Sequence, residues 1–459
     1  MKKFLGIFLA LLLSVTLVAC NTSSQSSTSS AESSEASSSS EATSSEASEE
    51  TPGDHDAIAD GREVNILFWE HNANVENQSP FLWHTAEAFM KQNPNVKIEF
   101  VGTEPIEHNN KILMAAQSGQ LPDMFFVEWA PQADLIELGL LYDISDSITE
   151  IKDHFLPGML RTAEDGAIYG LPNEPMLTCY FYNTEIFDEY GVDYPQDDWT
   201  WDDFINCCQS LKDAGVTPMS AGGMSSFAIW MHQETLVRFG FQDHYDGIVA
   251  GTDSWVNDDF LHAYEKIAEV GEKGFIPENT STLDYYQACE AFYGGNCAFL
   301  NAGVWECGKI TSAGMADKTQ VWLGPQIDGA PANNLAIKSS TAPYCISKAA
   351  AEADADKCEA MLAYFNYMYG PEGTQVMIDD AASVPVTLYD NTNFDNASPM
   401  IQKLMDALDN SYEPAKIPDS MVPASFQPSL YDSVWGTLYG TYTPEQAVEQ
   451  LQSQWDALG

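Results

Sequence analysis

Apolar and polar residues alternate over residues 64–68 (Val-Asn-Ile-Leu-Phe), which is typical of a half-buried β-strand. A serine-proline pair at 79–80 then marks a helix start, and apolar residues between 82 and 89 recur on one helical face. The pattern continues with a strand at 96–100, a helix at 109–118 and a strand at 124–127. This order predicts an α/β fold with an open, parallel sheet that has helices on both faces.

Two of these predicted strands end in an aromatic residue beside a carboxylate. Trp69, Glu70 and His71 follow the first strand, and Glu128 and Trp129 follow the third. Ligands of open α/β sheets bind outside the carboxyl ends of the strands. There an indole ring can stack on a sugar while a carboxylate accepts hydrogen bonds from its hydroxyls. These five residues are therefore candidate ligand contacts, with ordinary packing as the alternative for each tryptophan.

The second half of the chain contains two strong helix starts. Thr200 is expected to cap a helix whose first turn holds Asp203, and Thr443 and Gln446 have the spacing of a capping box. Trp201 falls on the apolar face of the first of these helices, so we expect it to pack in the core rather than bind a ligand.

The first residues indicate export and attachment to a membrane. Residues 1–19 combine two lysines with an apolar run of the length of a secretory signal. Leu17-Val18-Ala19-Cys20 resembles the lipobox of bacterial lipoproteins, in which the cysteine carries a diacylglycerol, so Cys20 is the expected lipidation site. Residues 20–61 are rich in serine and glutamate and predict a disordered tether.

The remaining chain, from residue 62 to 459, is about 400 residues long, which suits two lobes. The composition is strongly acidic, with 68 Asp and Glu against 19 Lys and Arg. Nucleic acid and anionic membrane surfaces are therefore poor partners, although solubility alone is an alternative reason for the charge. Because the only arginines are at 62, 161 and 238, a phosphate site is not expected, and the ligand should be neutral or cationic.

Eight cysteines follow Cys20, and none has metal-ligand spacing with paired histidines. Several lie at apolar positions, so most are expected to be free and buried, with Cys289–Cys297 as the nearest plausible disulfide. No metal or cofactor is expected, although the Asp-rich stretches leave calcium open.

A series of stretches in the chain carries a family resemblance. FWEHN, LPDMFFVEWA, AFYGGNCAFLNAGVWE, YMYGPEGTQVMID and SVPVT occur in this order. Together they resemble the extracellular solute-binding proteins of family 1, the sugar-binding components of ABC importers to which maltose-binding protein belongs. The resemblance implies a two-lobe, type II periplasmic-binding-protein-like fold with a hinge and an interlobe cleft, and it covers residues 62 to 459.

The resemblance also implies how the chain is divided. The N-terminal lobe is expected to comprise residues 62–175 and 337–383, and the C-terminal lobe residues 176–336 and 384–459. Ligand would bind in the cleft, and the lobes would close on it by hinge bending.

Further ligand contacts come from the resemblance alone. Trp305 corresponds to the aromatic residue that stacks on sugar from the second lobe, Glu174 to the hinge crossing, and Trp230 to a segment that often lines the cleft. Asn333 and Asn334 stand where the family often has a glycine pair, and their side chains could bind sugar hydroxyls. No catalytic residue is expected.

The expected function is that of a lipid-anchored binding protein on the extracellular face of the bacterial cytoplasmic membrane. It would bind a neutral mono- or oligosaccharide as a monomer, deliver it to the permease subunits of an ABC importer, and touch the membrane only through its anchor. Two alternatives remain: a glycoside hydrolase that uses Glu70 and Glu128 as paired carboxylates, and a polyamine-binding importer component.

Overall fold

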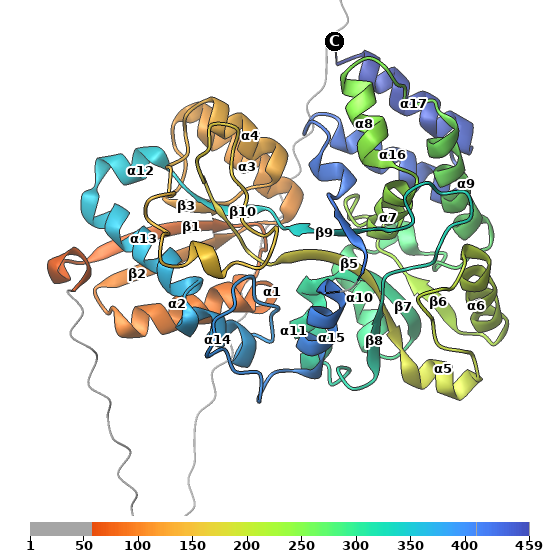
Figure 1. Cartoon of the computed structure of the whole chain (residues 1–459), viewed down its shortest axis with the longest axis horizontal. Coiled ribbons are helices and arrows are strands. Elements are labelled where there is room, and N and C mark those ends of the chain that lie inside the picture. The colour runs from red at the N-terminus through yellow and green to blue at the C-terminus, as the bar shows by residue number, and fades with distance from the viewer. Residues whose placement is uncertain (1–56, 410, 459) are drawn as a thin grey trace, which may run out of the picture. The chain divides into compact units, whose positions relative to one another are not determined.

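The computed structural model describes residues 57–409 and 411–458 of the chain. The predicted signal segment 1–19, the lipidation site Cys20 and the tether up to residue 56 lie outside the described residues. The described part is organised around two β-sheets, and we call the part built on each sheet the first lobe and the second lobe (Figure 1).

The first lobe contains, within the described residues, a five-stranded sheet in the order β2-β1-β3-β10-β4. Its strands are β1 (Val64–Glu70), β2 (Val96–Gly102), β3 (Met124–Phe126), β4 (Leu171–Pro172) and β10 (Pro343–Ile346). β1 pairs in parallel with β2 and β3, whereas β10 is antiparallel to β3 and β4. The predicted parallel core of three strands is confirmed, and two antiparallel strands extend it.

Helices cover both faces of this first sheet, as the sequence predicted. They are α1 (Val75–Gln78), α2 (Pro80–Gln92), α3 (Pro105–Ser118), α4 (Trp129–Glu137), α12 (Lys348–Ala353), α13 (Ala355–Met368) and α14 (Pro371–Asp379). One core joins Phe68 of β1 to α2 and α13, and a second core joins Phe125 of β3 to α3 and α4. Neighbouring residues of one strand point to opposite faces, so β1, β3 and β10 each contribute to both cores.

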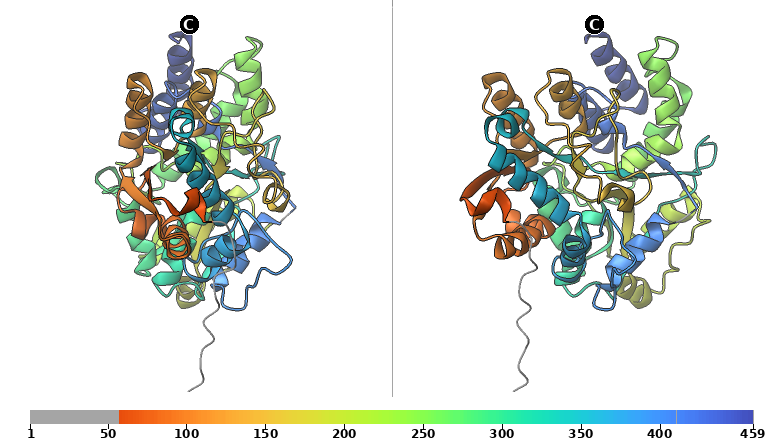
Figure 2. Two further views of the ribbon diagram at one scale, coloured as in Figure 1. Left: turned by 90° about the vertical axis from the view of Figure 1, so that its left-hand side faces the viewer. Right: turned by 60° about the vertical axis from the view of Figure 1, so that its left-hand side comes forward.

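The second lobe contains a mixed sheet in the order β11-β9-β5-β7-β6, with β8 also paired to β5. Its strands are β5 (Pro175–Asn183), β6 (Thr217–Ser220), β7 (Cys297–Gly303), β8 (Thr319–Trp322), β9 (Leu335–Ser340) and β11 (Glu413–Ala415). Its helices are α5 (Thr184–Tyr190), α6 (Trp201–Asp213), α7 (Trp230–Arg238), α8 (Phe241–Val249), α9 (Asp258–Glu272), α10 (Tyr285–Tyr293), α11 (Cys307–Ser312), α15 (Pro399–Leu408), α16 (Gln427–Leu438) and α17 (Pro444–Asp456). The C-terminal helix α17 packs against α16 and α9 (Figures 1 and 2).

The chain passes between the sheets at three places in the described part, and two of these places are adjacent. It leaves the first sheet after β4 and enters the second at β5, and it returns from β9 to β10. After α14 of the first lobe it passes once more to α15 and β11 of the second lobe. β9 pairs antiparallel with the start of β5 and parallel with β11, so residues 337–340 belong to the second sheet and not to the first lobe, where we had predicted them. The other predicted lobe borders remain predictions.

Helix caps follow the sequence closely, with one informative exception. Thr200 with Asp203, and Thr443 with Gln446, form complete capping boxes. Trp201 is buried in the core, as expected. Ser79 stands at the N-cap of α2 but makes no capping hydrogen bond, because its hydroxyl is bound to Glu70 instead.

The eight cysteines in the described part are free thiols. They include Cys289 and Cys297, the nearest plausible disulfide from the sequence. Seven are buried, in keeping with the role of cysteine as a small apolar residue. In residues 57–409 and 411–458, no helix has the length and apolar character to cross a membrane.

Candidate functional site

The carboxylate of Glu70, at the end of β1, is fully buried and organises the residues around it. Its Oε1 accepts hydrogen bonds from Ser79 Oγ at 3.0 Å and Asn72 Nδ2 at 3.3 Å, and lies 2.7 Å from His71 Nδ1. Ser79 and Asn72 are themselves joined at 2.8 Å. Since Glu70 has no exposed surface, it holds neighbouring side chains in place rather than reaching a ligand directly.

His71 is the partly exposed member of this group. Its ring stacks on Phe126 with centroids 3.7 Å apart and an interplanar angle of 18°. Burial opposes its protonation, but the charge and hydrogen bond of Glu70, with smaller contributions from Glu128 and Glu174, raise the pKa of His71 above its usual value. The neighbouring carboxyl groups, Glu70 above all, therefore favour the charged form of the His71 ring.

Glu128 and Trp129 lie where β3 gives way to α4, as predicted. Removal from water, reinforced by Asp419 of the second lobe and opposed by His71, raises the pKa of Glu128 to about 7. Asp419 lies in the short helix η5 (Pro418–Ser420) and accepts hydrogen bonds from Gln233 at 3.0 Å and Tyr431 at 3.1 Å. A carboxyl group of the second lobe thus helps to raise the pKa of a carboxyl group in the first lobe.

Glu174 lies at the crossing between the sheets. Its backbone N–H donates hydrogen bonds to Asn173 Oδ1 at 2.9 Å and Thr341 Oγ1 at 3.0 Å. The Thr341 N–H donates in turn to the Glu174 carbonyl at 3.2 Å. Burial, with the nearby charge of Glu306, raises the pKa of the Glu174 carboxyl to about 8, although His71 opposes the shift. The two crossing segments therefore fix Glu174 at the junction of the lobes.

The second lobe contributes an aromatic cluster. Trp230, at the start of α7, has its ring centroid 5.0 Å from Trp305 and 4.9 Å from Tyr285. Trp305 Nε1 donates to the Tyr285 hydroxyl at 2.8 Å, and the Tyr285 hydroxyl donates to the buried carboxylate of Glu306. These bonds set the orientation of Trp305. The predicted tryptophans of this lobe are thus brought together as one aromatic surface.

A hydrogen bond joins the lobes directly. The hydroxyl of Tyr286 on α10 donates to Asn72 Oδ1 at 2.9 Å, and Asn72 is anchored to Ser79 and Glu70 in the first lobe. The bond connects the aromatic side of the site to the network of Glu70.

Replacing Tyr286 by phenylalanine is expected to weaken this link between the lobes. A net hydrogen bond contributes about 1 kcal/mol, so the equilibrium between lobe arrangements should shift roughly fivefold toward a more open form. Small-angle X-ray scattering of the unliganded protein should show a larger radius of gyration. Tyr190→Phe, at an exposed position, is the matched control, and an unchanged profile for Tyr286→Phe would contradict the role of this bond.

Three predicted residues lie apart from this group. The ring of Trp69 packs beside the core of α3 and α4 with Lys111 Nζ 3.8 Å from its centroid. The Asn333 side chain closes a turn by bonding to the backbone of Ile327 and Ala330. Asn334 is exposed after that turn. The structure therefore brings together Glu70, His71, Glu128, Glu174, Trp230 and Trp305, with Trp129 beside Glu128, but not these three.

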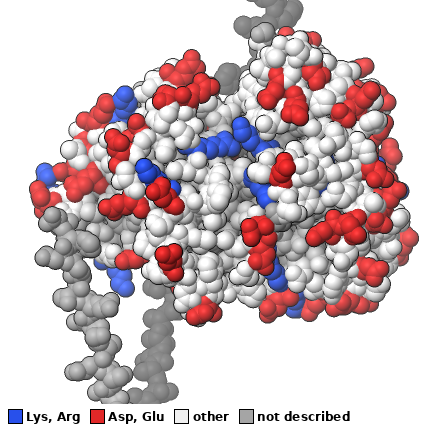
Figure 3. All heavy atoms as spheres, viewed as in Figure 1, with Lys and Arg blue, Asp and Glu red and all other residues white. Residues whose placement is uncertain are grey.

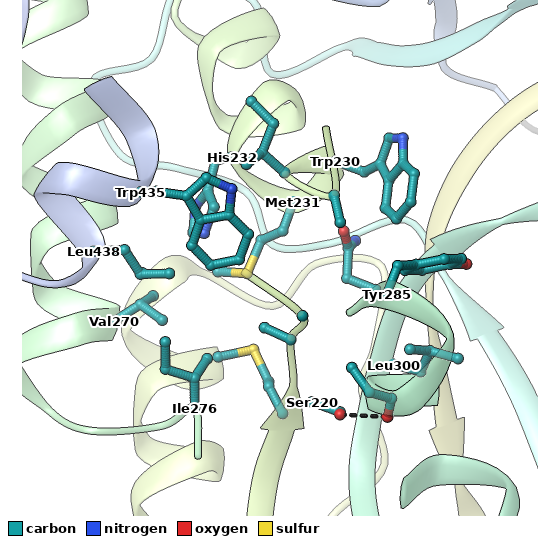
Figure 4. Close-up of a pocket in the computed structure, with 17 residues that line it drawn as sticks. Ser220, Trp230, Met231, His232, Val270, Ile276, Tyr285, Leu300, Trp435 and Leu438 are labelled. Carbon is teal, nitrogen blue, oxygen red and sulfur yellow. Dashed lines mark hydrogen bonds between the residues drawn. The ribbon is translucent and has the colours of Figure 1, made fainter. Parts of the chain in front are cut away.

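A small pocket lies behind the aromatic cluster, inside the second lobe (Figure 4). Trp230 and Tyr285 lie on one side of it, and Trp435, Leu438 and Val270 on the other. Its volume of about 40 Å³ suits a few water molecules and not a sugar ring. It is therefore a feature of the core behind the site rather than the site itself.

Sequence reasoning missed several polar residues of the site. Glu306 directly follows Trp305, the same pairing of tryptophan and carboxylate that pointed to Glu70 and Glu128, so this signal was present in the sequence. Tyr286, Asn72 and Asp419 carried no such signal, because only the packing of the lobes places them here. Within the described residues, no group of three or more His, Cys, Asp or Glu side chains is arranged to hold a metal ion.

Comparison with known proteins places this geometry in a family. Residues 73–375 match the family described as bacterial extracellular solute-binding protein. An uncharacterized ABC transporter extracellular-binding protein of Pyrococcus horikoshii is 28% identical over 240 residues, which cover 50% of this chain and 53% of that protein. The arabinooligosaccharide-binding protein of Halalkalibacterium halodurans is 27% identical over 261 residues, or 54% and 55% of the two chains. The chain thus spans about half the length of these curated relatives.

Solved structures match over a larger share of the chain. A chitin oligosaccharide binding protein superposes with a TM-score of 0.76 at 23% identity, covering 86% of this chain and 98% of the other. The maltose/maltodextrin-binding domain of Bdellovibrio bacteriovorus gives a TM-score of 0.69 at 16% identity, covering 86% and 99%. These likenesses establish the type II two-lobe fold. Since the family match extends over most of the chain, the protein belongs to the bacterial extracellular solute-binding proteins.

Proposed function

We propose that this protein captures a carbohydrate between its two lobes and delivers it to an ABC importer. The observation that carries the proposal is the meeting of an aromatic surface from the second lobe, Trp230 and Trp305, with hydrogen-bonding groups from the first lobe and the hinge, His71, Glu128 and Glu174. Aromatic faces that stack on a sugar ring, with polar groups that bind its hydroxyls, suffice for affinity without chemistry.

Support for a carbohydrate also comes from the relatives. Two of the proteins similar to this chain are arabinooligosaccharide-binding proteins by name. The family is one of solute-binding proteins rather than enzymes. Delivery to permease subunits, attachment through Cys20 to the extracellular face of the membrane, and a monomeric state belong to the same proposal.

The arrangement of Glu70 argues against a glycoside hydrolase. Paired catalytic carboxylates must both flank the glycosidic bond. Glu70 is fully buried and is already bound by Ser79 and Asn72, so it cannot act as the partner of Glu128 across a substrate. We therefore propose that the protein binds its ligand without turning it over.

A thermal-shift screen against neutral and basic mono- and oligosaccharides, and against polyamines, tests the proposal. A bound ligand at 100 times its Kd should stabilise the protein by about 2.7 kcal/mol and raise its melting midpoint. Trp305→Ala should abolish the shift, because it removes the stacking surface, while Trp199→Ala, outside the proposed site, should retain it. A shift with polyamines alone would overturn the proposal, as would recovery of the sugar in cleaved form.

A further inference from the structure

The carboxyl groups at the junction of the lobes fall into two sets. Glu70, Glu306 and Asp419 each accept hydrogen bonds from neighbouring side chains: Glu70 from Ser79 and Asn72, Glu306 from Tyr285 and Tyr293, and Asp419 from Gln233 and Tyr431. Among the described residues, none donates a hydrogen bond to the carboxyl group of Glu128 or Glu174. Glu70 Oε2 also lacks a partner, but it is shielded from solvent. Glu128 and Glu174 are therefore the carboxyl groups left for a ligand.

The lack of a partner is most costly at Glu174. Only 6% of this residue is exposed, and its backbone is held by Asn173 and Thr341. Its carboxyl oxygens are not among the partnerless atoms that are shielded from solvent, so a ligand donor can reach them. A buried carboxyl without a donor either stays protonated or takes a positive group. The Glu174 carboxyl group can therefore accept hydrogen bonds from a ligand. It lies at the junction of the lobes, where the charges of His71 from the first lobe and Glu306 from the second act on its pKa.

The basic residues nearby are engaged elsewhere. His71 lies 2.7 Å from Glu70, the Arg161 guanidinium lies 3.8 Å from the Trp129 ring, and Arg238 is paired with Glu234 at 3.4 Å. None of them forms an ion pair with Glu128 or Glu174. On the surface as well, acidic side chains are spread widely over the visible face and basic ones are few (Figure 3).

From this arrangement we infer that the ligand is a carbohydrate that carries a basic amino group, which binds Glu174 as an ammonium ion. The inference rests on the proposed carbohydrate-binding function and specifies the class of sugar. An ammonium group can donate charge-assisted hydrogen bonds to Glu174, whereas a hydroxyl supplies only a neutral donor. On binding, a protonated Glu174 releases its proton to water and the ligand nitrogen supplies the compensating charge. The acidic surface would also attract such a ligand over long range.

Matched sugars that differ at one substituent test this inference. Isothermal titration of the purified protein at pH 7 would compare β-1,4-linked glucosamine oligomers with the N-acetylglucosamine and glucose oligomers of equal length. The galactosamine and galactose monosaccharides form a second pair. We expect the amino sugar to bind at least tenfold more tightly than its neutral counterpart in the series that fits the site.

Substitution of Glu174 assigns the preference to its carboxyl group. In Glu174→Gln, the ratio of amino-sugar to neutral-sugar affinity should fall tenfold or more. The same ratio measured for Glu128→Gln tests separately whether the Glu128 carboxyl group contributes to the preference. Glu189→Gln, which removes the same charge at an exposed position on α5, should leave the ratio unchanged. Equal or tighter binding of the neutral sugars overturns the inference but leaves the proposed function standing. If no carbohydrate, basic or neutral, binds or stabilises the protein, both fall.

Discussion

Replacing Arg238 by methionine is expected to lower the free energy of unfolding by about 3–5 kcal/mol, because it leaves a buried carboxylate without its cation. Arg238 is only 1% exposed and lies 3.4 Å from Glu234 one helical turn earlier on α7. Its guanidinium also donates to the carbonyl oxygens of Asn333 at 2.6 Å and Leu323 at 2.9 Å. Glu234 in turn accepts a hydrogen bond from the Ile337 N–H of β9 at 3.2 Å. The pair therefore attaches α7 to a strand of the hinge.

Calorimetric melting of the parent protein and of Arg238→Met measures this loss of stability directly. The double variant Glu234→Gln/Arg238→Met should recover part of the lost stability, since it removes the unpaired charge together with its partner. Arg62→Met is a matched control, because Arg62 lies on the surface and its ion pair with Asp356 is partly exposed. A loss of less than about 1 kcal/mol in Arg238→Met would show that the ion pair is not what holds this region together.

The unliganded protein is expected to lose stability as the pH rises from 6.5 to 9, and Glu174 should account for much of the loss. The pKa of Glu174 is raised to about 8, so the folded state keeps a proton that the unfolded chain releases. This contribution is complete at pH values below the ordinary carboxyl pKa and disappears as the pH passes 8. Because pH 6.5 lies 1.5 units below the pKa of Glu174, the free energy of unfolding should fall by about 2 kcal/mol over this pH range.

Thermal midpoints measured at intervals between pH 6.5 and 9 test this effect. Glu174→Gln, which resembles the protonated form, should flatten the pH dependence and be more stable than the parent protein at pH 9. Glu189→Gln should follow the parent curve. The range starts at 6.5 because burial lowers the pKa of His108 to about 4 and of His232 to about 3, so these histidines reduce stability only at lower pH. Parallel curves for the parent and Glu174→Gln would refute the prediction.

The sequence alone determined the elements that depend on local patterns. The alternation over 64–68, the proline at 80 and the capping boxes at Thr200 and Thr443 each predicted an element that the structure contains. The parallel pairing of β1 with β2 and β3 also followed from the order of strands and helices. These features were predictable because each depends on residues a few positions apart or on a strong rule of chain connection.

Only the tertiary structure decided which candidates meet. Trp69 and Glu70 are neighbours in sequence, but consecutive residues of a strand face opposite sides, so Trp69 packs beside α3 while Glu70 organises His71 and Asn72. Asn333 is used within its own turn. Glu306, Asp419 and Tyr286 join the site from positions far along the chain. Such convergence is set by the packing of the lobes and the two crossings at Glu174 and Thr341, which local sequence patterns do not encode.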